Sequence, residues 1–244
     1  MNYYYITGTS RGIGKSLAEL LLKDDKNYVT GFSRSCTVKH PHYHHVVLDL
    51  SDLDKVSKLN FPRHQNAGRI VLVNNAGYIG EIKRAGRHKR KTLIDTYSIN
   101  LTSPTVLINK FINTYNDSSA KKIIFNVSSG AGRSPIDAAS AYCASKAGLD
   151  MFSRVIAEEQ KITNAGYRIV SISVGVVDTA MQKMLRDADA GEFSRKAEFI
   201  GYKEKKQILH PEYAAEKFAE IIDNIDKINE VVFSFREYEN MNIK

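Results

Sequence analysis

The sequence has few cysteines, few prolines and no long apolar run. Among its 244 residues, Cys36 and Cys143 are the two cysteines, and five prolines are scattered along the chain. Two cysteines are too few for a disulfide scaffold and are typical of a reducing compartment, although their spacing leaves a mutual disulfide open. No apolar run approaches the ~18 residues that a membrane-spanning helix needs, and low-complexity tracts are absent. These absences exclude an integral membrane protein and a disordered chain.

The composition and the first residues indicate an ordinary globular protein. The chain is 43% hydrophobic and 25% charged, which is enough to bury a sizeable core. The opening residues, MNYYYI, lack the basic, apolar and small-residue succession of a secretory signal, so we expect a cytoplasmic location. Without a linker or an internal repeat, residues 1–244 are predicted to form one domain.

Positive charge exceeds negative charge. The 35 Lys and Arg residues outnumber the 27 Asp and Glu residues, which gives a net charge of +8. Such a charge could bind a nucleic acid, an anionic membrane surface or a phosphorylated small molecule. The densest cluster is Lys83–Lys91, called the basic segment below. It has no interleaved aromatic residues, and no helix-turn-helix, zinc-finger or RNA-binding signature accompanies it. We therefore expect no nucleic-acid and no membrane partner, and polyanion binding by the basic segment remains an alternative hypothesis.

Strand-like and helix-like segments alternate from end to end. Seven mostly apolar runs predict buried strands near Tyr3–Thr7, Tyr28–Phe32, His45–Leu48, Arg69–Asn74, Lys122–Val127, Arg168–Val174 and Glu230–Ser234. Amphipathic segments between them, such as 13–23 and 211–225, predict covering helices. This alternation predicts an α/β fold in which a parallel sheet carries helices on both faces. Residues 179–208 are long, rich in charge and interrupted by glycines, so we expect a lid-type insertion there.

A glycine-rich turn joins the first strand to the first helix. Residues 7–14 read TGTSRGIG. The glycines permit a tight turn and a close approach of the backbone to a pyrophosphate, and the helix N-terminus offers unpaired N–H groups to it. The turn predicts a dinucleotide site, although a plain strand-to-helix turn could produce the same pattern.

Further motifs follow this turn in a fixed order. They are residues 74–77 (NNAG), Asn100, Ser128–Ser129 and residues 142–146 (YCASK). In their order and approximate spacing, these motifs resemble the short-chain dehydrogenase/reductase family over nearly the whole chain. Within the family, residues 100–103 and 175–182 resemble the sepiapterin reductase and benzil reductase branch. The resemblance implies a Rossmann-type doubly wound sheet, a nicotinamide cofactor and a carbonyl or alcohol substrate.

The end of the second strand distinguishes NADP from NAD. An acidic side chain there would bind the ribose 2′-hydroxyl and repel a 2′-phosphate. The sequence has Ser33 and Arg34 instead, and Arg11 in the glycine turn should project toward the same region. Two guanidinium groups could bracket a 2′-phosphate, so we predict NADP(H), although either arginine alone could be a solvated surface charge.

The family resemblance implies the remaining cofactor contacts. The full set is Gly8, Ser10, Arg11, Gly12, Ile13, Gly14, Ser33, Arg34, Asp49, Leu50, Asn75, Ala76, Gly77, Tyr142, Lys146, Val177, Thr179 and Met181. Asp49 would accept the adenine amino group, or it is only an acidic residue before a helix that starts near Ser51. Thr179 would hydrogen-bond the cofactor.

The catalytic residues are expected on one helix and one strand end. Tyr142 and Lys146 are four residues apart and share a helix face, so a nearby ammonium should lower the pKa of the phenol from ~10. By the resemblance, Tyr142 donates a proton to the substrate carbonyl, Lys146 holds the nicotinamide ribose, and Ser129 polarises the carbonyl. Ser128 is the rival hydroxyl. Asn100 would hold a water linked to Lys146, or be a structural amide at a helix kink, and both can be true.

Together these features predict an NADPH-dependent carbonyl reductase that acts on a ketone or a vicinal dicarbonyl. The substrate would contact Ser129, Tyr142 and Gly175. The alternative is a non-catalytic NADP(H)-binding sensor or scaffold, which has no need of the phenol. Residues 40–45 contain four histidines in a loop entering the third strand, and we expect no metal site there.

The segments Thr92–Tyr115 and Ala139–Gln160 resemble the helices through which the family forms dimers, so we expect a homodimer.

Overall fold

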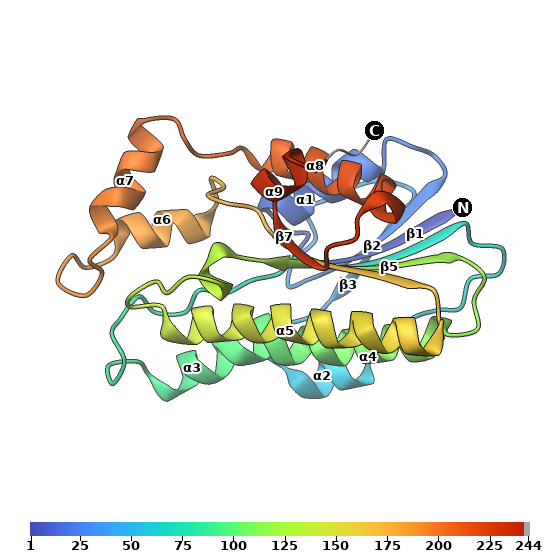
Figure 1. Ribbon diagram of the computed structural model, residues 1–244, viewed down its shortest axis with the longest axis horizontal. Helices are drawn as coiled ribbons and strands as arrows, with labels where there is room; N and C mark the ends of the chain where they lie inside the picture. Colours follow the sequence, from blue (N-terminus) through green and yellow to red (C-terminus); the bar gives the residue numbers. More distant parts are fainter. Residues whose placement is uncertain (242–244) are drawn as a thin grey trace.

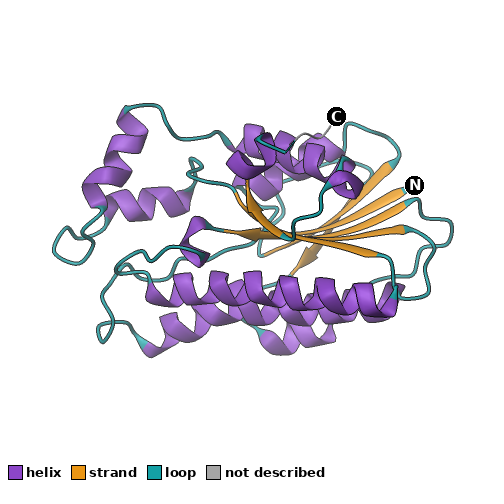
Figure 2. Ribbon diagram, viewed as in Figure 1, coloured by secondary structure: helices purple, strands orange, loops and turns teal. Residues whose placement is uncertain are grey.

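A seven-stranded parallel sheet forms the centre of the computed structural model, which describes residues 1–241. Across the sheet the strands lie in the order β3 (Tyr43–Val47), β2 (Asn27–Ser33), β1 (Asn2–Thr7), β4 (Arg69–Asn74), β5 (Lys121–Ser128), β6 (Tyr167–Ser173) and β7 (Val232–Ser234). Figure 2 shows the sheet between two layers of helices. The chain runs outward from β1 to β3, then returns to β4 and runs outward the other way. The predicted doubly wound α/β sheet is confirmed, and its direction switches between β1 and β4.

Helices cover both faces of the sheet. One face carries α1 (Gly12–Leu21), α8 (Pro211–Asp223) and the short α9 (Phe235–Glu239). The other carries α2 (Leu53–Lys58), α3 (Arg90–Tyr97), α4 (Ser103–Tyr115) and α5 (Ser140–Thr163), as Figure 1 shows. Among the helices of residues 1–241, none combines the length and the apolarity that crossing a bilayer requires.

Two apolar cores explain why the strands are such continuous apolar runs. Successive residues of a strand point to opposite faces, so a strand covered on both sides is apolar at every position. In β4, Val71 and Val73 belong to the core under α1 and α8, whereas Ile70 and Leu72 belong to the core under α4 and α5. All four side chains are fully buried.

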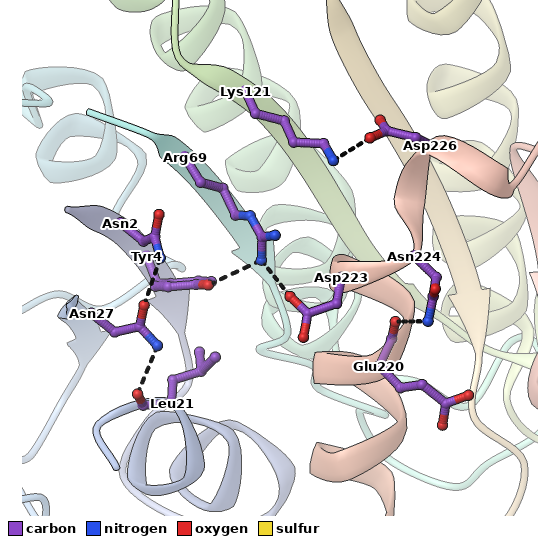
Figure 3. A network of polar contacts seen from close by, with 10 residues as sticks. All are labelled: Asn2, Tyr4, Leu21, Asn27, Arg69, Lys121, Glu220, Asp223, Asn224 and Asp226. Atoms are coloured by element: carbon purple, nitrogen blue, oxygen red, sulfur yellow. Dashed lines mark hydrogen bonds and ion pairs between the residues drawn. The ribbon is translucent and has the colours of Figure 1, made fainter. Parts of the chain in front are cut away.

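Polar contacts close the amino end of the sheet, as Figure 3 shows. Arg69 at the start of β4 donates to Asp223 at 2.6 Å and to the Tyr4 hydroxyl at 3.4 Å. Lys121 at the start of β5 pairs with Asp226 in the short 3₁₀ turn Ile225–Lys227. These contacts fix the end of α8 against the strands, and the residues predicted to be functional gather at the opposite, carboxyl end.

Residues 179–208 extend beyond the carboxyl ends of the strands. They form α6 (Ala180–Asp187) and α7 (Lys196–Glu204), which project at one side of the molecule in Figure 1. At their base, Val177 and Leu209 form an isolated β-bridge, and Asp178 pairs with Lys203 and, at 3.7 Å, with Arg186. The two ends of the projecting segment are therefore tied to each other.

Candidate active site

Glycine residues let the turn after β1 fold tightly against the start of α1 and Asn75, and this turn is called the glycine cradle below. Gly8 and Gly12 have φ of +78° and +58°, which glycine adopts readily. A Cβ atom on Gly14 would lie 2.5 Å from the Gly8 carbonyl oxygen and 2.3 Å from Asn75 Nδ2. The side chain of Arg11, which precedes α1, makes no capping hydrogen bond, so it leaves the first N–H groups of the helix to another acceptor. The turn therefore fits a bound pyrophosphate.

The NNAG segment is bound to this turn through Thr7. The Thr7 hydroxyl accepts hydrogen bonds from the backbone N–H groups of Asn75 and Ala76, both at 3.0 Å. The Asn75 amide donates in turn to the Thr7 carbonyl at 2.9 Å. The turns after β1 and β4 thus form one continuous surface at the switch point of the sheet.

Tyr43 and Thr37 support the glycine turn from the side of β2 and β3. The Thr37 hydroxyl donates to the Ser10 carbonyl at 2.9 Å, and the hydroxyls of Thr9 and Tyr43 lie 2.8 Å apart. A Cβ atom on Gly31 would lie 2.0 Å from the Tyr43 hydroxyl oxygen, so glycine leaves the space that Tyr43 occupies. The sequence did not indicate these contacts, because neither Thr37 nor Tyr43 belongs to a motif.

Arg34 lies close enough to Asp49 to influence its charge. The pKa of Asp49 is lowered chiefly by the backbone N–H of Ser51, with a smaller contribution from Arg34. Asp49 accepts from the Ser51 N–H at 2.9 Å and from its hydroxyl at 2.8 Å. The helix that was expected near Ser51 begins at Leu53, because Asp52 caps it by accepting from the Lys55 N–H. Arg11 and Arg34 are both exposed.

Residues from distant segments meet beside Gly77. A Cβ atom added at Gly77 would lie 3.5 Å from Met181 Cε and 3.9 Å from both Asn100 Oδ1 and Lys146 Nζ. A Cβ atom on Gly12 would lie 3.6 Å from Thr179. The structure therefore brings together the cofactor residues expected after β1, after β4, on α5 and at the start of α6.

Tyr142 is buried between Ser129 and Lys146. Its side chain is 7% exposed, and Lys146 Nζ lies 5.8 Å from the centre of its ring. Burial raises the pKa of Tyr142 to about 12, and a hydrogen bond with Ser129 acts in the opposite direction. The predicted lowering of the pKa is therefore wrong for the free protein. Burial dominates this shift, and Lys146, whose Nζ donates to the Val127 carbonyl at 2.7 Å, is not among the groups that lower the pKa of the phenol.

The two candidate serines have different surroundings. Ser128 is the last residue of β5, and its hydroxyl is buried without a hydrogen-bond partner among the described residues. Ser129 precedes the 3₁₀ turn Gly130–Gly132, accepts from the Ala131 N–H at 3.2 Å and lies close enough to Tyr142 to lower the pKa of its phenol. Of the two, Ser129 is the hydroxyl that the structure places at the phenol.

Asn100 lies in a π-helical turn, Ser98–Thr102, between α3 and α4. Its amide accepts from the Tyr78 N–H at 2.8 Å and donates to the Tyr78 carbonyl at 2.7 Å and to Ser145 at 3.1 Å. π-Helical turns within helices occur often at functional sites. The amide therefore connects the segment after β4 to α5, as expected of a structural amide at a helix irregularity, and the proposed water relay stays a prediction.

An apolar cluster covers Tyr142. It contains Ile79, Ala131, Ala138, Ala139, Leu185, Ala188, Phe193 and Phe199, with Ile82, Ile136, Cys143, Met181 and Tyr202 packed against it. The side chains from the region of α6 and α7 lie on those from the segments after β4 and β5. Gly175, two residues after the end of β6, has φ of +77° and open space around its Cβ position.

The basic segment holds part of this cover in place. Glu192, between α6 and α7, accepts from the Arg84 N–H at 3.1 Å and from the Arg87 guanidinium at 2.5 Å. Lys83 and Lys89 lie 3.8 and 3.7 Å from Glu81. The positive charge of this segment is therefore partly neutralised within the chain, which its composition did not indicate.

Comparison with known proteins identifies similar chains. Residues 2–190 match the short chain dehydrogenase family. Benzil reductase ((S)-benzoin forming) from Bacillus subtilis is 34% identical over 224 residues, which are 88% of this chain and 90% of that protein. Sepiapterin reductase from Xenopus tropicalis is 26% identical over 239 residues, 89% and 90% of the two chains. A solved short chain dehydrogenase/reductase from Saccharomyces cerevisiae has a TM-score of 0.82 at 25% identity and covers 96% of each chain.

Proposed function

This chain belongs to the short chain dehydrogenase family and is an oxidoreductase that acts on carbonyl or hydroxyl groups, and we propose that it is an NADPH-dependent carbonyl reductase. The substrate class would be a ketone or a vicinal dicarbonyl, which is reduced to an alcohol or a hydroxyketone. The observation that carries the proposal is the position of Ser129, Tyr142 and Lys146 under an apolar cover and beside the glycine cradle. The benzil reductase similarity favours an aromatic dicarbonyl over a pterin.

Each residue of the site has its own role in the proposed reduction. NADPH, when bound, supplies a hydride to the carbonyl carbon. Tyr142 donates its proton to the carbonyl oxygen, and a pKa of about 12 keeps the phenol protonated at neutral pH before the reaction. Ser129 donates a hydrogen bond to the same oxygen and thereby orients the carbonyl. The Lys146 ammonium would hold the nicotinamide ribose, and its charge favours the phenolate that remains after proton transfer.

The cover over Tyr142 has a role in the same scheme. Residues 179–208 would act as a substrate lid, with Met181, Phe193 and Phe199 against the substrate. Removing water from the carbonyl strengthens the hydrogen bonds of Ser129 and Tyr142 to its oxygen. The whole chain, including this lid, is proposed to be one cofactor-binding domain.

The test is NADPH oxidation with a panel of diketones, quinones and pterins, together with NADPH binding measured by fluorescence. The proposal expects tight binding and turnover with at least one dicarbonyl. Tight binding without turnover on any compound of the panel would contradict the reductase and favour the alternative sensor or scaffold. That alternative explains the cradle, but it gives no reason for a phenol between Ser129 and Lys146.

The cofactor preference depends on the two exposed arginines. Substituting Arg11 and Arg34 together by alanine is expected to reduce the preference for NADPH over NADH about 30-fold, because charge-assisted bonds to a 2′-phosphate contribute ~2 kcal/mol. Kd values for both cofactors measure the change. Lys15→Ala is the control, since it removes an exposed charge of α1 that is paired with Glu19. An equal loss of NADPH and NADH affinity in the double variant would refute the assignment.

A homodimer is proposed through α3, α4 and α5. Large apolar side chains on α3 and α5 are exposed: Ile94, Tyr97, Met151, Val155 and Ile162, with exposures of 52%, 40%, 57%, 47% and 80%. Such a surface is costly unless a partner covers it. Sedimentation at micromolar concentration is expected to give the mass of a dimer, and Met151→Glu with Val155→Glu the mass of a monomer. A monomeric wild-type chain would contradict the proposal.

We propose a cytoplasmic location as well. Cys36 and Cys143 are free thiols in the structure, which is compatible with a reducing compartment.

A further inference from the structure

A buried carboxylate lies one helical turn beyond Lys146. Asp150 follows Lys146 by four residues on α5 and Tyr142 by eight, so the three side chains lie along one buried face of the helix. Asp150 is 2% exposed and Lys146 is 3% exposed. A carboxylate so far from water is unfavourable unless hydrogen bonds or a positive charge compensate for its desolvation.

The hydrogen bonds of Asp150 are incomplete. Oδ1 accepts from the Ser171 hydroxyl of β6 at 2.7 Å. Oδ2 is buried and has no hydrogen-bond partner within residues 1–241. Gly132 packs against this oxygen, because a Cβ atom there would lie 3.0 Å from Oδ2 and 3.0 Å from the Lys146 carbonyl carbon. One neutral hydroxyl does not compensate for a buried negative charge. On α5, Lys146 lies four residues before Asp150 and is buried, whereas Arg154, four residues after Asp150, is exposed to solvent.

The groups around Lys146 on the other elements are uncharged. β5 presents the Val127 carbonyl, and the π-helical turn and the segment after β4 present the Asn100 amide and Gly77. On α5 itself, Tyr142 and Asp150 flank Lys146. β6 and the 3₁₀ turn, which also pack on this face, contribute Ser171 and Gly132. Within this set, Asp150 is the group that carries a negative charge.

We propose that Asp150 is a positioning residue that keeps the buried Lys146 ammonium charged. Asp150 would affect catalysis only through Lys146, so this part of the inference rests on the proposed function. The effect of Asp150 on the charge of Lys146 is independent of the proposed function. Burial lowers the pKa of Lys146 to about 8, and the negative charge of Asp150 acts in the opposite direction. Without this charge the pKa falls further, and a lysine whose pKa has fallen loses its proton at a lower pH. The site then loses the ammonium at neutral pH.

The direct test is an NMR titration of Lys146 in the cofactor-free protein. Lysine labelled with ¹³C at Cε reports the protonation of each ammonium, and Lys146→Met identifies the signal of Lys146. The wild type is expected to titrate near 8. Asp150→Asn keeps the shape and the Ser171 contact but removes the charge, and it is expected to lower the midpoint by about one unit or more. Ser171→Ala, the matched control, removes the hydrogen bond but keeps the charge, and its midpoint should stay at the wild-type value.

The kinetic consequence gives a second readout. In Asp150→Asn the basic limb of the kcat/KM profile should move to lower pH with the midpoint of Lys146, giving about a 10-fold loss above pH 8 and near wild-type activity at low pH. An unchanged midpoint in Asp150→Asn would overturn the inference, even if activity fell, because a packing role alone would produce that result. A shifted midpoint in a protein without reductase activity would support the inference and refute the proposed function.

A stability measurement covers the case in which Asp150→Asn does not fold. Lys146→Met leaves the carboxylate buried without its cation, so adding Asp150→Asn to Lys146→Met should raise the free energy of unfolding relative to Lys146→Met alone. A double variant that is no more stable than Lys146→Met would contradict the electrostatic coupling between Lys146 and Asp150.

Discussion

Replacing Tyr142 with phenylalanine is expected to lower kcat about 10³-fold and to leave the Kd for NADPH unchanged. The substitution removes the hydroxyl and keeps the ring, which packs in the apolar cluster with Phe193 and Leu185. The proton donor to the carbonyl oxygen is then missing, whereas the glycine cradle is intact. Steady-state kinetics and a fluorescence titration with NADPH measure the two quantities.

The neighbouring residue provides the control for this experiment. Cys143 packs on the same cluster, and its thiol contacts the Ile136 carbonyl at 3.7 Å. Cys143→Ala should keep kcat within about a factor of three, because cysteine behaves as a small apolar residue in such a position. A Tyr142→Phe protein with more than a tenth of the wild-type kcat would refute the role of Tyr142 as proton donor.

The second large effect is expected at Gly14. In Gly14→Ala, the added Cβ atom would lie 2.5 Å from the Gly8 carbonyl oxygen. The backbone of the glycine turn must move to relieve this contact. Overpacking of this kind costs ~2–3 kcal/mol, which corresponds to about a 100-fold loss of NADPH affinity if the cost is concentrated in the turn. Isothermal titration with NADPH measures the loss, and chemical denaturation separates it from a general loss of stability.

Gly201 is a suitable control glycine. It lies within α7 with no atom near its Cβ position, so Gly201→Ala should leave the NADPH affinity unchanged and stabilise the helix by ~0.5–1 kcal/mol. NADPH affinity in Gly14→Ala equal to the wild type would mean that the cofactor does not use the glycine turn.

The central strands were predictable because their environment is uniform. Strands β1, β4 and β5 are buried on both faces, so hydrophobic residues alone mark them, and the predicted bounds agree with the structure to within one residue. β3 lies at the sheet edge and contains His44 and His45 in addition to valines. Its predicted start at His45 is two residues late, because an edge strand is held by pairing with β2 and not by a continuous apolar run.

The candidate site was predictable where residues lie close together in the sequence. The spacing of Tyr142 and Lys146 places both on one face of a helix, and the structure has both buried on α5. The pKa of Tyr142 was not predictable in this way, because it depends on the burial produced by the segment containing α6 and α7. The Tyr43 contact with Thr9 and the position of Asp150 beside Ser171 likewise depend on the pairing of separate strands and helices.

The most direct test of the central proposal is the reduction of benzil by the wild-type protein with NADPH. The loss of NADPH absorbance and the amount of hydroxyketone, separated by chromatography, are measured in the same reaction, with NADH in a parallel one. We predict equimolar loss of NADPH and formation of hydroxyketone, at a higher rate than with NADH. Binding of NADPH without oxidation by benzil or by the other dicarbonyls of the panel would contradict the assignment of this chain as an NADPH-dependent dicarbonyl reductase.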